Sequence, residues 1–219
     1  MKKPNEGTRK EQDFLGEVDV PDNALYGIHS CRARDNFPDS TAFHKEWYEA
    51  IGVVKKACYL TSRDYFVAVS KKYPEKNIRT LQEDQLKALI LAASEVAAGS
   101  YFDHWIVPAV SGGAGTSINM NANEIIANAA LLKLGRKPGD YSVIDPLEHA
   151  NIFQSTNDVI PTSLKICLLN LLLKLESSIN ETRTEVEKIE TAHRNSLKIA
   201  YTQMQEAVPS SFGKLFSTY

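Results

Sequence analysis

The fold is decided by residues 154–175, which read QSTNDVIPTSLKICLLNLLLKL. A strongly apolar run fills most of this stretch, and four side chains that can hydrogen-bond stand directly before it. From Leu164 onward apolar residues recur at spacings of three and four, and neither Gly nor Pro occurs between Thr162 and Ile199. This pattern predicts one unbroken helix from about 158 to 199. Its length is on the order of 55 Å.

The first half of this helix is apolar almost all round, which is typical of a helix surrounded by other helices. One such helix cannot bury itself, so its neighbours must come from other copies, from another polypeptide or from further chain. We therefore predict a mainly α fold. A small mixed N-terminal domain (1–157) would precede the first long helix of a central helical bundle (158–219).

The rest of the chain predicts shorter elements. Residues 16–21 alternate Val with charged residues, as a half-buried strand does, and the polar first dozen residues are expected to be frayed. Apolar spacing predicts three further helices, over 44–70, 81–106 and 121–134. Gly135 stands where a left-handed C-terminal cap belongs, and a turn is expected around Pro209.

Composition and charge exclude several classes of protein. The 219 residues carry 25 basic and 27 acidic side chains, mixed along the chain, so no bulk field attracts nucleic acid or a membrane surface. The most apolar run is too short to span a bilayer, and the N-terminus lacks the apolar core of a signal peptide. The cysteines, Cys31, Cys58 and Cys167, lie far apart, which argues against a disulfide framework or a zinc site. We predict a cytoplasmic protein.

Two polar clusters stand at predicted helix starts. In SGGAGTSINMNANE, residues 111–124, three glycines let the backbone approach a ligand, and Thr116, Ser117 and Asn119 supply hydrogen-bonding groups. Backbone N–H groups and the dipole at a helix start favour an anion, although a flexible turn with an ordinary cap would have the same composition. The second cluster consists of Ser155, Thr156, Asn157 and Asp158. One cap needs one such residue, so the surplus could hold a carboxylate.

A third cluster lies beyond the long helix and contains Thr202 and Gln203, although polar residues are also common at any turn. If the helix is unbroken, Asn157 and Thr202 stand at its opposite ends and cannot serve one site within one chain. If both contact the same ligand, the site lies between subunits of a symmetric oligomer.

Four segments together resemble the aspartase/fumarase superfamily, most closely its aspartate ammonia-lyase branch. They are DFLGEVDVPDNALYGIHSCRARDNFP, GGAGTSINMNANEIIAN, HANIFQSTNDVIPTS and TQMQEAVPSSFG. The resemblance runs in order from about residue 13 to Tyr219. It implies a homotetramer in which a shared helical bundle joins the subunits, and active sites that are each built from three of them. It also implies reversible elimination of ammonia from L-aspartate to give fumarate, without a metal or organic cofactor.

The resemblance assigns roles to the polar clusters. Thr116, Ser155 and Thr156 would be the catalytic residues, stabilising the enediolate that forms when the Cβ proton is removed. Asn157, Thr202 and Gln203 would contact the amino group, and Ser117 and Asn119 complete the substrate-binding set.

The sequence also departs from the family pattern. Relatives carry the catalytic base, a serine, in a Gly-Ser-Ser-x-x-Met-Pro-x-Lys-x-Asn loop that does not occur here. Ala200 and Tyr201 replace the usual Gly-Arg before Thr202, and Glu206 replaces the usual Asp. We therefore expect the chain to be inactive alone, with a homo-oligomer or a complementing C-terminal chain as partner. The alternatives are a non-catalytic dicarboxylate-binding or assembly subunit, and a fumarase-type lyase.

Overall fold

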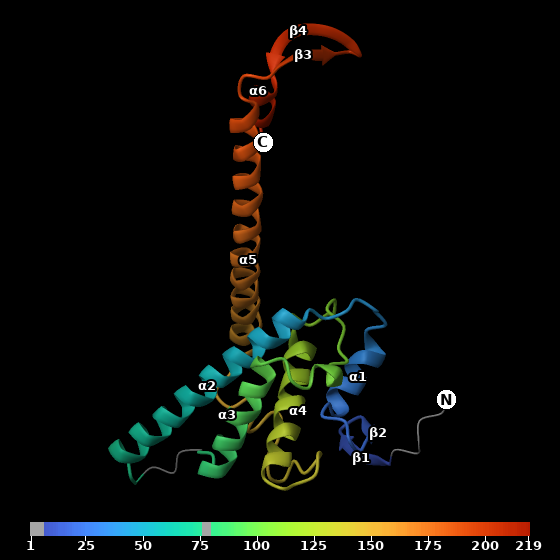
Figure 1. The fold of residues 1–219 in the computed structure, drawn as a ribbon. Coiled ribbons are helices and arrows are strands. Elements are labelled where there is room, and N and C mark those ends of the chain that lie inside the picture. The colour runs from blue at the N-terminus through green and yellow to red at the C-terminus, as the bar shows by residue number, and fades with distance from the viewer. Residues whose placement is uncertain (1–6, 76–79) are drawn as a thin grey trace. The chain divides into compact units, whose positions relative to one another are not determined.

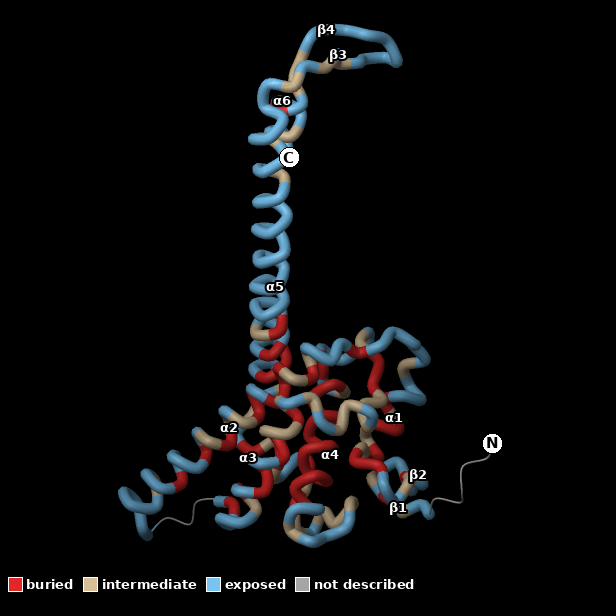
Figure 2. The backbone as a smooth tube through the Cα atoms, viewed as in Figure 1, coloured by how far each residue is buried: buried red, intermediate tan, exposed pale blue. Residues whose placement is uncertain are grey.

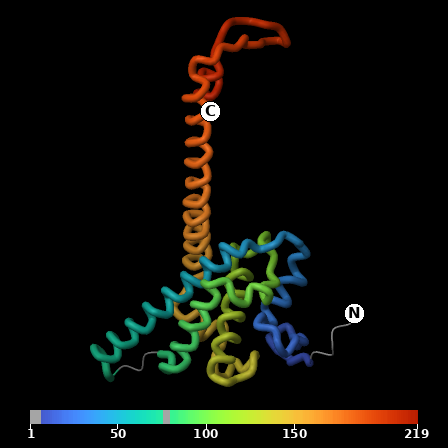
Figure 3. Tube along the Cα trace, viewed as in Figure 1, coloured from blue at the N-terminus to red at the C-terminus, as the bar shows by residue number. Residues whose placement is uncertain are grey.

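The computed structural model describes residues 7–75 and 80–219, and Figure 3 follows the chain from its N-terminus to its C-terminus. The predicted mainly α fold is confirmed, with two small strand pairs beside the helices (Figure 1). The elements in chain order are β1 (Thr8–Asp13), β2 (Gly16–Pro21), α1 (Ile28–Asn36), α2 (Lys45–Lys72), α3 (Glu83–Ala97), η1 (Phe102–His104), α4 (Thr116–Lys133), α5 (Thr156–His193), β3 (Leu197–Thr202), β4 (Gln205–Ser211) and α6 (Phe212–Phe216).

The chain forms two compact units, Met1–Cys167 and Leu168–Tyr219. The core of the first unit lies among α2, α3 and α4, where the buried residues gather (Figure 2). α3 begins with a capping box in which Gln82 and Gln85 exchange side-chain-to-backbone hydrogen bonds. α2 and α3 approach closely at Gly52, where an added Cβ would lie 2.8 Å from the Cα of Ala97. The predicted domain boundary after residue 157 stays a prediction.

α4 is the central helix of the first unit and is buried on nearly every side. Several of its buried side chains are polar, namely Asn119, Asn121, Asn123, Glu124 and Asn128. Burying polar groups is costly unless they are hydrogen-bonded, so a helix with this composition must be surrounded by polar partners. α4 therefore places a polar layer inside an otherwise apolar unit.

The N-terminal segment differs from the prediction. Residues 8–12 are not frayed, because they belong to β1, which pairs antiparallel with the predicted strand β2. The register places Thr8 opposite Pro21 and Asp13 opposite Gly16. The prediction for residues 1–6 lies outside the described residues.

The predicted helix 81–106 is wrong at its C-terminal end. α3 stops at Ala97, since the chain turns through left-handed conformations at Gly99 (φ 81°) and Tyr101 (φ 65°) before η1. The third predicted helix starts too late, because α4 begins at Thr116 rather than near residue 121. The left-handed conformation expected of Gly135 is confirmed (φ 70°).

The long helix is confirmed as unbroken through α5, but it ends earlier than predicted. α5 stops at His193, and residues 197–199, predicted as helix, belong to β3. The turn expected at Pro209 is also wrong, since Pro209 lies within β4 opposite Ile199. In a two-stranded pair every strand is an edge, where Pro is tolerated because its missing N–H can face away from the partner.

The second unit exposes many apolar side chains. In α5 they include Leu168, Leu169, Leu172, Leu173, Leu175 and Ile179, which are 49–65 % exposed. Figure 2 shows this part of α5 as almost entirely exposed. No helix in the described part of the chain is long and apolar enough to cross a membrane.

Candidate active site

The candidate site is built at the first turn of α5. Ser155 precedes the helix, and its Oγ accepts a hydrogen bond from the backbone N–H of Asn157 (3.2 Å). This is the geometry of an N-cap, so Ser155 supplies the cap that the sequence predicted as one alternative. One residue of the polar cluster is thus sufficient for capping. Within the described residues the backbone N–H of Thr156 has no partner and remains available to a ligand.

The first turn of α4 lies against the first turn of α5. Gly115 precedes α4 with φ 82°, in the left-handed region that favours glycine. A Cβ at Gly115 would lie 2.9 Å from the Cγ2 of Ile160, so only glycine permits this approach. The glycine loop therefore brings the starts of two helices together, and their dipoles both favour an anion there.

A direct hydrogen bond joins the two helices. The Asn119 Nδ2 donates to the Thr156 Oγ1 and to the Asn151 Oδ1, and the donor–acceptor distance is 3.1 Å in each case. The Thr156 oxygen is therefore an acceptor on its inner side. No hydrogen bond among the described residues uses the Thr156 hydroxyl as a donor, so its proton is available to a further acceptor.

Behind this pair lies a lysine that sequence reasoning missed. Lys55 of α2 is fully buried, and its Nζ donates to the Asn123 Oδ1 (2.6 Å), the Gln154 Oε1 (2.7 Å) and the Asn151 Oδ1 (3.2 Å). Burial lowers the pKa of Lys55 to about 7, and the electrostatic effect of Cys58 on this pKa has the opposite direction. A signal existed in the sequence, because Lys55 follows Ile51 by four residues on the apolar face of its helix.

The remaining predicted residues of the first unit lie at or near these helix starts. The Thr116 hydroxyl donates to the carbonyl of Gly113 (2.7 Å) and is exposed. Ser117 is half-buried and, with Thr116, lines an open hollow of about 680 Å³ that also contains His29. Asn157 is exposed at the first turn of α5. The structure thus joins Asn119 and Thr156 by a hydrogen bond. The other predicted residues of this unit are close to one of these two in the sequence, namely Thr116, Ser117, Ser155 and Asn157.

Thr202 and Gln203 belong to the second unit. Thr202 ends β3 and pairs with Gln205 at the start of β4, and both predicted residues are exposed. Gln203 (φ 49°) and Met204 (φ 63°) form the two-residue turn of this hairpin in left-handed conformations. The 38 residues of α5 separate them from Ser155 along the chain.

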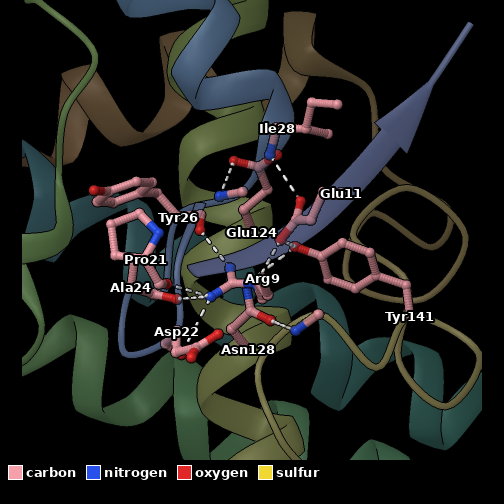
Figure 4. A network of polar contacts seen from close by, with 12 residues as sticks. Arg9, Glu11, Pro21, Asp22, Ala24, Tyr26, Ile28, Glu124, Asn128 and Tyr141 are labelled. Atoms are coloured by element: carbon pink, nitrogen blue, oxygen red, sulfur yellow. Dashed lines mark hydrogen bonds and ion pairs between the residues drawn. The ribbon is translucent and has the colours of Figure 1, made fainter. Parts of the chain in front are cut away.

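A network of buried carboxylates surrounds the first turn of α1. Glu124 accepts backbone N–H groups of Gly27 (2.8 Å), His29 (2.9 Å) and Ser30 (3.2 Å), together with the Ser30 hydroxyl. It thereby caps α1 from another helix (Figure 4). Burial raises the pKa of the Glu124 carboxyl, while these donors act in the opposite direction.

A second carboxylate completes this network. The Glu11 Oε2 accepts the backbone N–H of Ile28 (2.8 Å), and its Oε1 accepts from Arg9 (2.8 Å) and from the Tyr141 hydroxyl (3.1 Å) (Figure 4). Sequence reasoning missed this cap, because its two acceptors come from β1 and α4. No group of three or more His, Cys, Asp or Glu in residues 7–75 and 80–219 is arranged to hold a metal ion.

Comparison with known proteins identifies the class to which this fold and site belong. A family model described as Lyase matches residues 16–219, and the chain belongs to this family, the aspartase/fumarase superfamily. Along almost its whole length the chain resembles aspartate ammonia-lyases. It is 38% identical to the aspartate ammonia-lyase of Bacillus sp over 216 residues, which cover 98% of this chain and 43% of the relative.

Other relatives carry different names. The chain is 37% identical to the class II fumarate hydratase of Halobacterium salinarum, covering 98% of this chain and 43% of that protein. The fold matches the crystal structure of a fumarate lyase:delta crystallin from Brucella melitensis with a TM-score of 0.83 and 36% identity, over 96% of this chain and 47% of that one. The chain therefore spans less than half the length of the relatives it matches.

Proposed function

We propose that this chain supplies part of the active site of an aspartate ammonia-lyase, which reversibly eliminates ammonia from L-aspartate to give fumarate. The observation that carries the proposal is the meeting of two helix starts at Gly115 and Ile160, where the Thr156 Oγ1 accepts from Asn119 and none of the described residues accepts the Thr156 hydroxyl proton. This arrangement gives one substrate carboxylate unpaired N–H groups, favourable dipoles and hydroxyl donors.

The chemistry explains why donors at this position matter. Removal of the Cβ proton moves negative charge onto the neighbouring carboxylate, which becomes an enediolate. Donors that are already aimed at that charge stabilise the transition state more than the substrate. Ser155 and Thr156 have this role in the proposal, and Thr116 joins them once its hydroxyl turns from Gly113 to the ligand. Ser117, Asn119 and Asn157 complete the binding set on this unit.

Proton abstraction needs a group beyond these. The hydrogen bonds of the Thr116, Ser155 and Thr156 hydroxyls within the described residues involve only backbone groups and the Asn119 amide. A hydroxyl without an adjacent base is a weak base or nucleophile. We therefore assign proton abstraction to a group other than these three hydroxyls. We assign the contacts with the amino group to Thr202 and Gln203 of a second subunit.

The assembly follows from the same reasoning. Thr202 and Gln203 belong to the second unit and follow Ser155 by the 38 residues of α5, so we assign them to the site of a second subunit. The exposed leucines of α5 are typical of a helix that packs against further helices. A cytoplasmic homo-oligomer, completed by chain that corresponds to the unmatched part of the relatives, satisfies both requirements. No metal or organic cofactor has a role in it.

We expect the purified chain alone not to convert L-aspartate to fumarate, as followed by the ultraviolet absorbance of fumarate. Co-production with the part of the Bacillus relative that this chain does not match is expected to give measurable turnover. L-malate is the matched control substrate. Fumarate formed from malate but not from aspartate would favour a fumarase-type lyase instead. A folded complex that binds dicarboxylates without turnover would favour a non-catalytic subunit. Robust turnover of aspartate by the chain alone would contradict the assignment of the proton-abstracting group.

A further inference from the structure

The buried lysine behind the site has no role in the chemistry described above. An ammonium group without water must be surrounded by acceptors, and Lys55 finds three in the side-chain oxygens of Asn123, Asn151 and Gln154. Since an ammonium group only donates, it fixes which end of each amide faces it. Lys55 thus favours one orientation of all three amides. For Asn151 the same orientation is favoured by the Asn123 Nδ2, which donates to the Asn151 Oδ1 (3.3 Å), and by the backbone carbonyl of Gln154.

That orientation is passed on to the candidate site. With its oxygen toward Lys55, Asn151 also accepts the Asn119 Nδ2, and its own Nδ2 donates to the carbonyl of Gln154 (3.1 Å). Asn119 must therefore present its amino end to Asn151. The same amino end donates to the Thr156 Oγ1. The Thr156 oxygen is thereby occupied as an acceptor on the inner side.

Lys55 opposes the other orientation of Asn151, together with the Asn123 Nδ2 and the Gln154 carbonyl. If Asn151 turned its Nδ2 toward Asn119, two amino groups would face each other, and Asn119 would turn as well. The Asn119 Oδ1 would then face Thr156 and accept its hydroxyl proton. At present this oxygen is buried and has no hydrogen-bond partner in the described structure, so it would gain one by turning. The hydroxyl would point inward and be lost to a ligand.

We propose that Lys55 is a positioning residue, which holds the Asn151 and Asn119 amides so that the Thr156 hydroxyl donates outward to the substrate carboxylate. The inference rests on the proposed function only for the identity of the ligand. The groups that face Lys55 from α4 and from residues 150–155 are neutral amides, and the ionisable neighbour on its own helix is Cys58.

The test compares Lys55→Met, which keeps the length of the side chain but has no donors, with Lys71→Met, an exposed lysine of the same helix. In the ligand-free wild-type chain and in Lys71→Met, NMR is expected to show nuclear Overhauser contacts from the Asn119 side-chain NH₂ protons to Thr156. In Lys55→Met these contacts are expected to be lost, while the backbone amide signals of α4 persist. Retention of the contacts in folded Lys55→Met would overturn the proposal.

A second measurement needs no variant, should Lys55→Met fail to fold. In the wild-type chain the side-chain amide signals of Asn123, Asn151 and Gln154 are expected to titrate together with the Lys55 Cε signal, with a common midpoint near pH 7. Amide signals whose chemical shifts do not change as Lys55 titrates would overturn the proposal. Because neither measurement uses a dicarboxylate, failure of the proposed function would show separately, as a lack of succinate binding by a chain whose amide network behaves as stated.

Discussion

Replacing Glu124 by leucine is expected to unfold the N-terminal unit. The variant leaves the N–H groups of Gly27, His29 and Ser30, and the Ser30 hydroxyl, without their buried acceptor. Each unsatisfied buried donor costs about 1–3 kcal/mol, so the sum approaches the roughly 5–15 kcal/mol that stabilises a typical domain. Glu124→Gln keeps one acceptor oxygen but turns an amino group toward donors, and an intermediate loss is expected.

Urea denaturation followed by tryptophan fluorescence measures the free energy of unfolding of the N-terminal unit, because both tryptophans, Trp47 and Trp105, lie within residues 1–167. Glu17→Leu is the matched control, since Glu17 is exposed and forms a surface ion pair with Lys10. The control is expected to change the free energy of unfolding by less than about 1 kcal/mol. A Glu124→Leu variant as stable as this control would show that the network does not hold α1 in place.

Replacing Thr156 by valine is expected to lower the turnover of the complemented enzyme by about a hundredfold or more. Valine has nearly the same shape, but it removes the donor that the proposal aims at the enediolate, and losing one such donor typically costs this much in rate. The fold is expected to tolerate the change, because Asn119 keeps its hydrogen bond to Asn151.

The control for this prediction is Thr162→Val, a change of the same kind at an exposed position of the same helix. Initial rates of fumarate formation at saturating aspartate compare the two variants. If Thr156→Val retained more than about a third of the wild-type rate, Thr156 could not be the main donor to the charge that forms. Thr162→Val is expected to stay close to the wild-type rate.

The long helix shows how far periodicity alone predicts this fold. Apolar spacing without Gly or Pro correctly predicted an unbroken helix through α5, because both signals are local. The hairpin after it was missed, since its turn uses Gln203 and Met204, which carry no Gly, Asn or Asp signal for left-handed conformations. The turn predicted at Pro209 is wrong, because an edge strand accommodates this residue.

Those parts of the candidate site that depend on residue type and local spacing could be predicted from the sequence. Those that depend on contacts between residues far apart in the sequence could not. The glycine loop and the polar residues before α5 were recognisable from their types and spacing. Asn119 is predicted as a substrate-binding residue, but its hydrogen bond to Thr156 is not predictable, nor are the roles of Lys55 and Glu124. Each of these contacts joins residues 37 to 97 positions apart in the sequence. Polar residues at positions of the apolar face of a predicted helix are the sequence signal that could have indicated these roles, because a buried polar group needs a partner.

The central claim is that the starts of α4 and α5 form one carboxylate site on this chain, and NMR titration with succinate tests it most directly. Succinate carries the two carboxylates of the substrate but no amino group to eliminate. At millimolar concentrations we expect chemical-shift changes centred on Thr116, Ser155 and Thr156, and a clear weakening of these changes in Thr156→Val. Succinate that leaves these three signals unmoved, or that shifts signals elsewhere in the chain, would contradict the account.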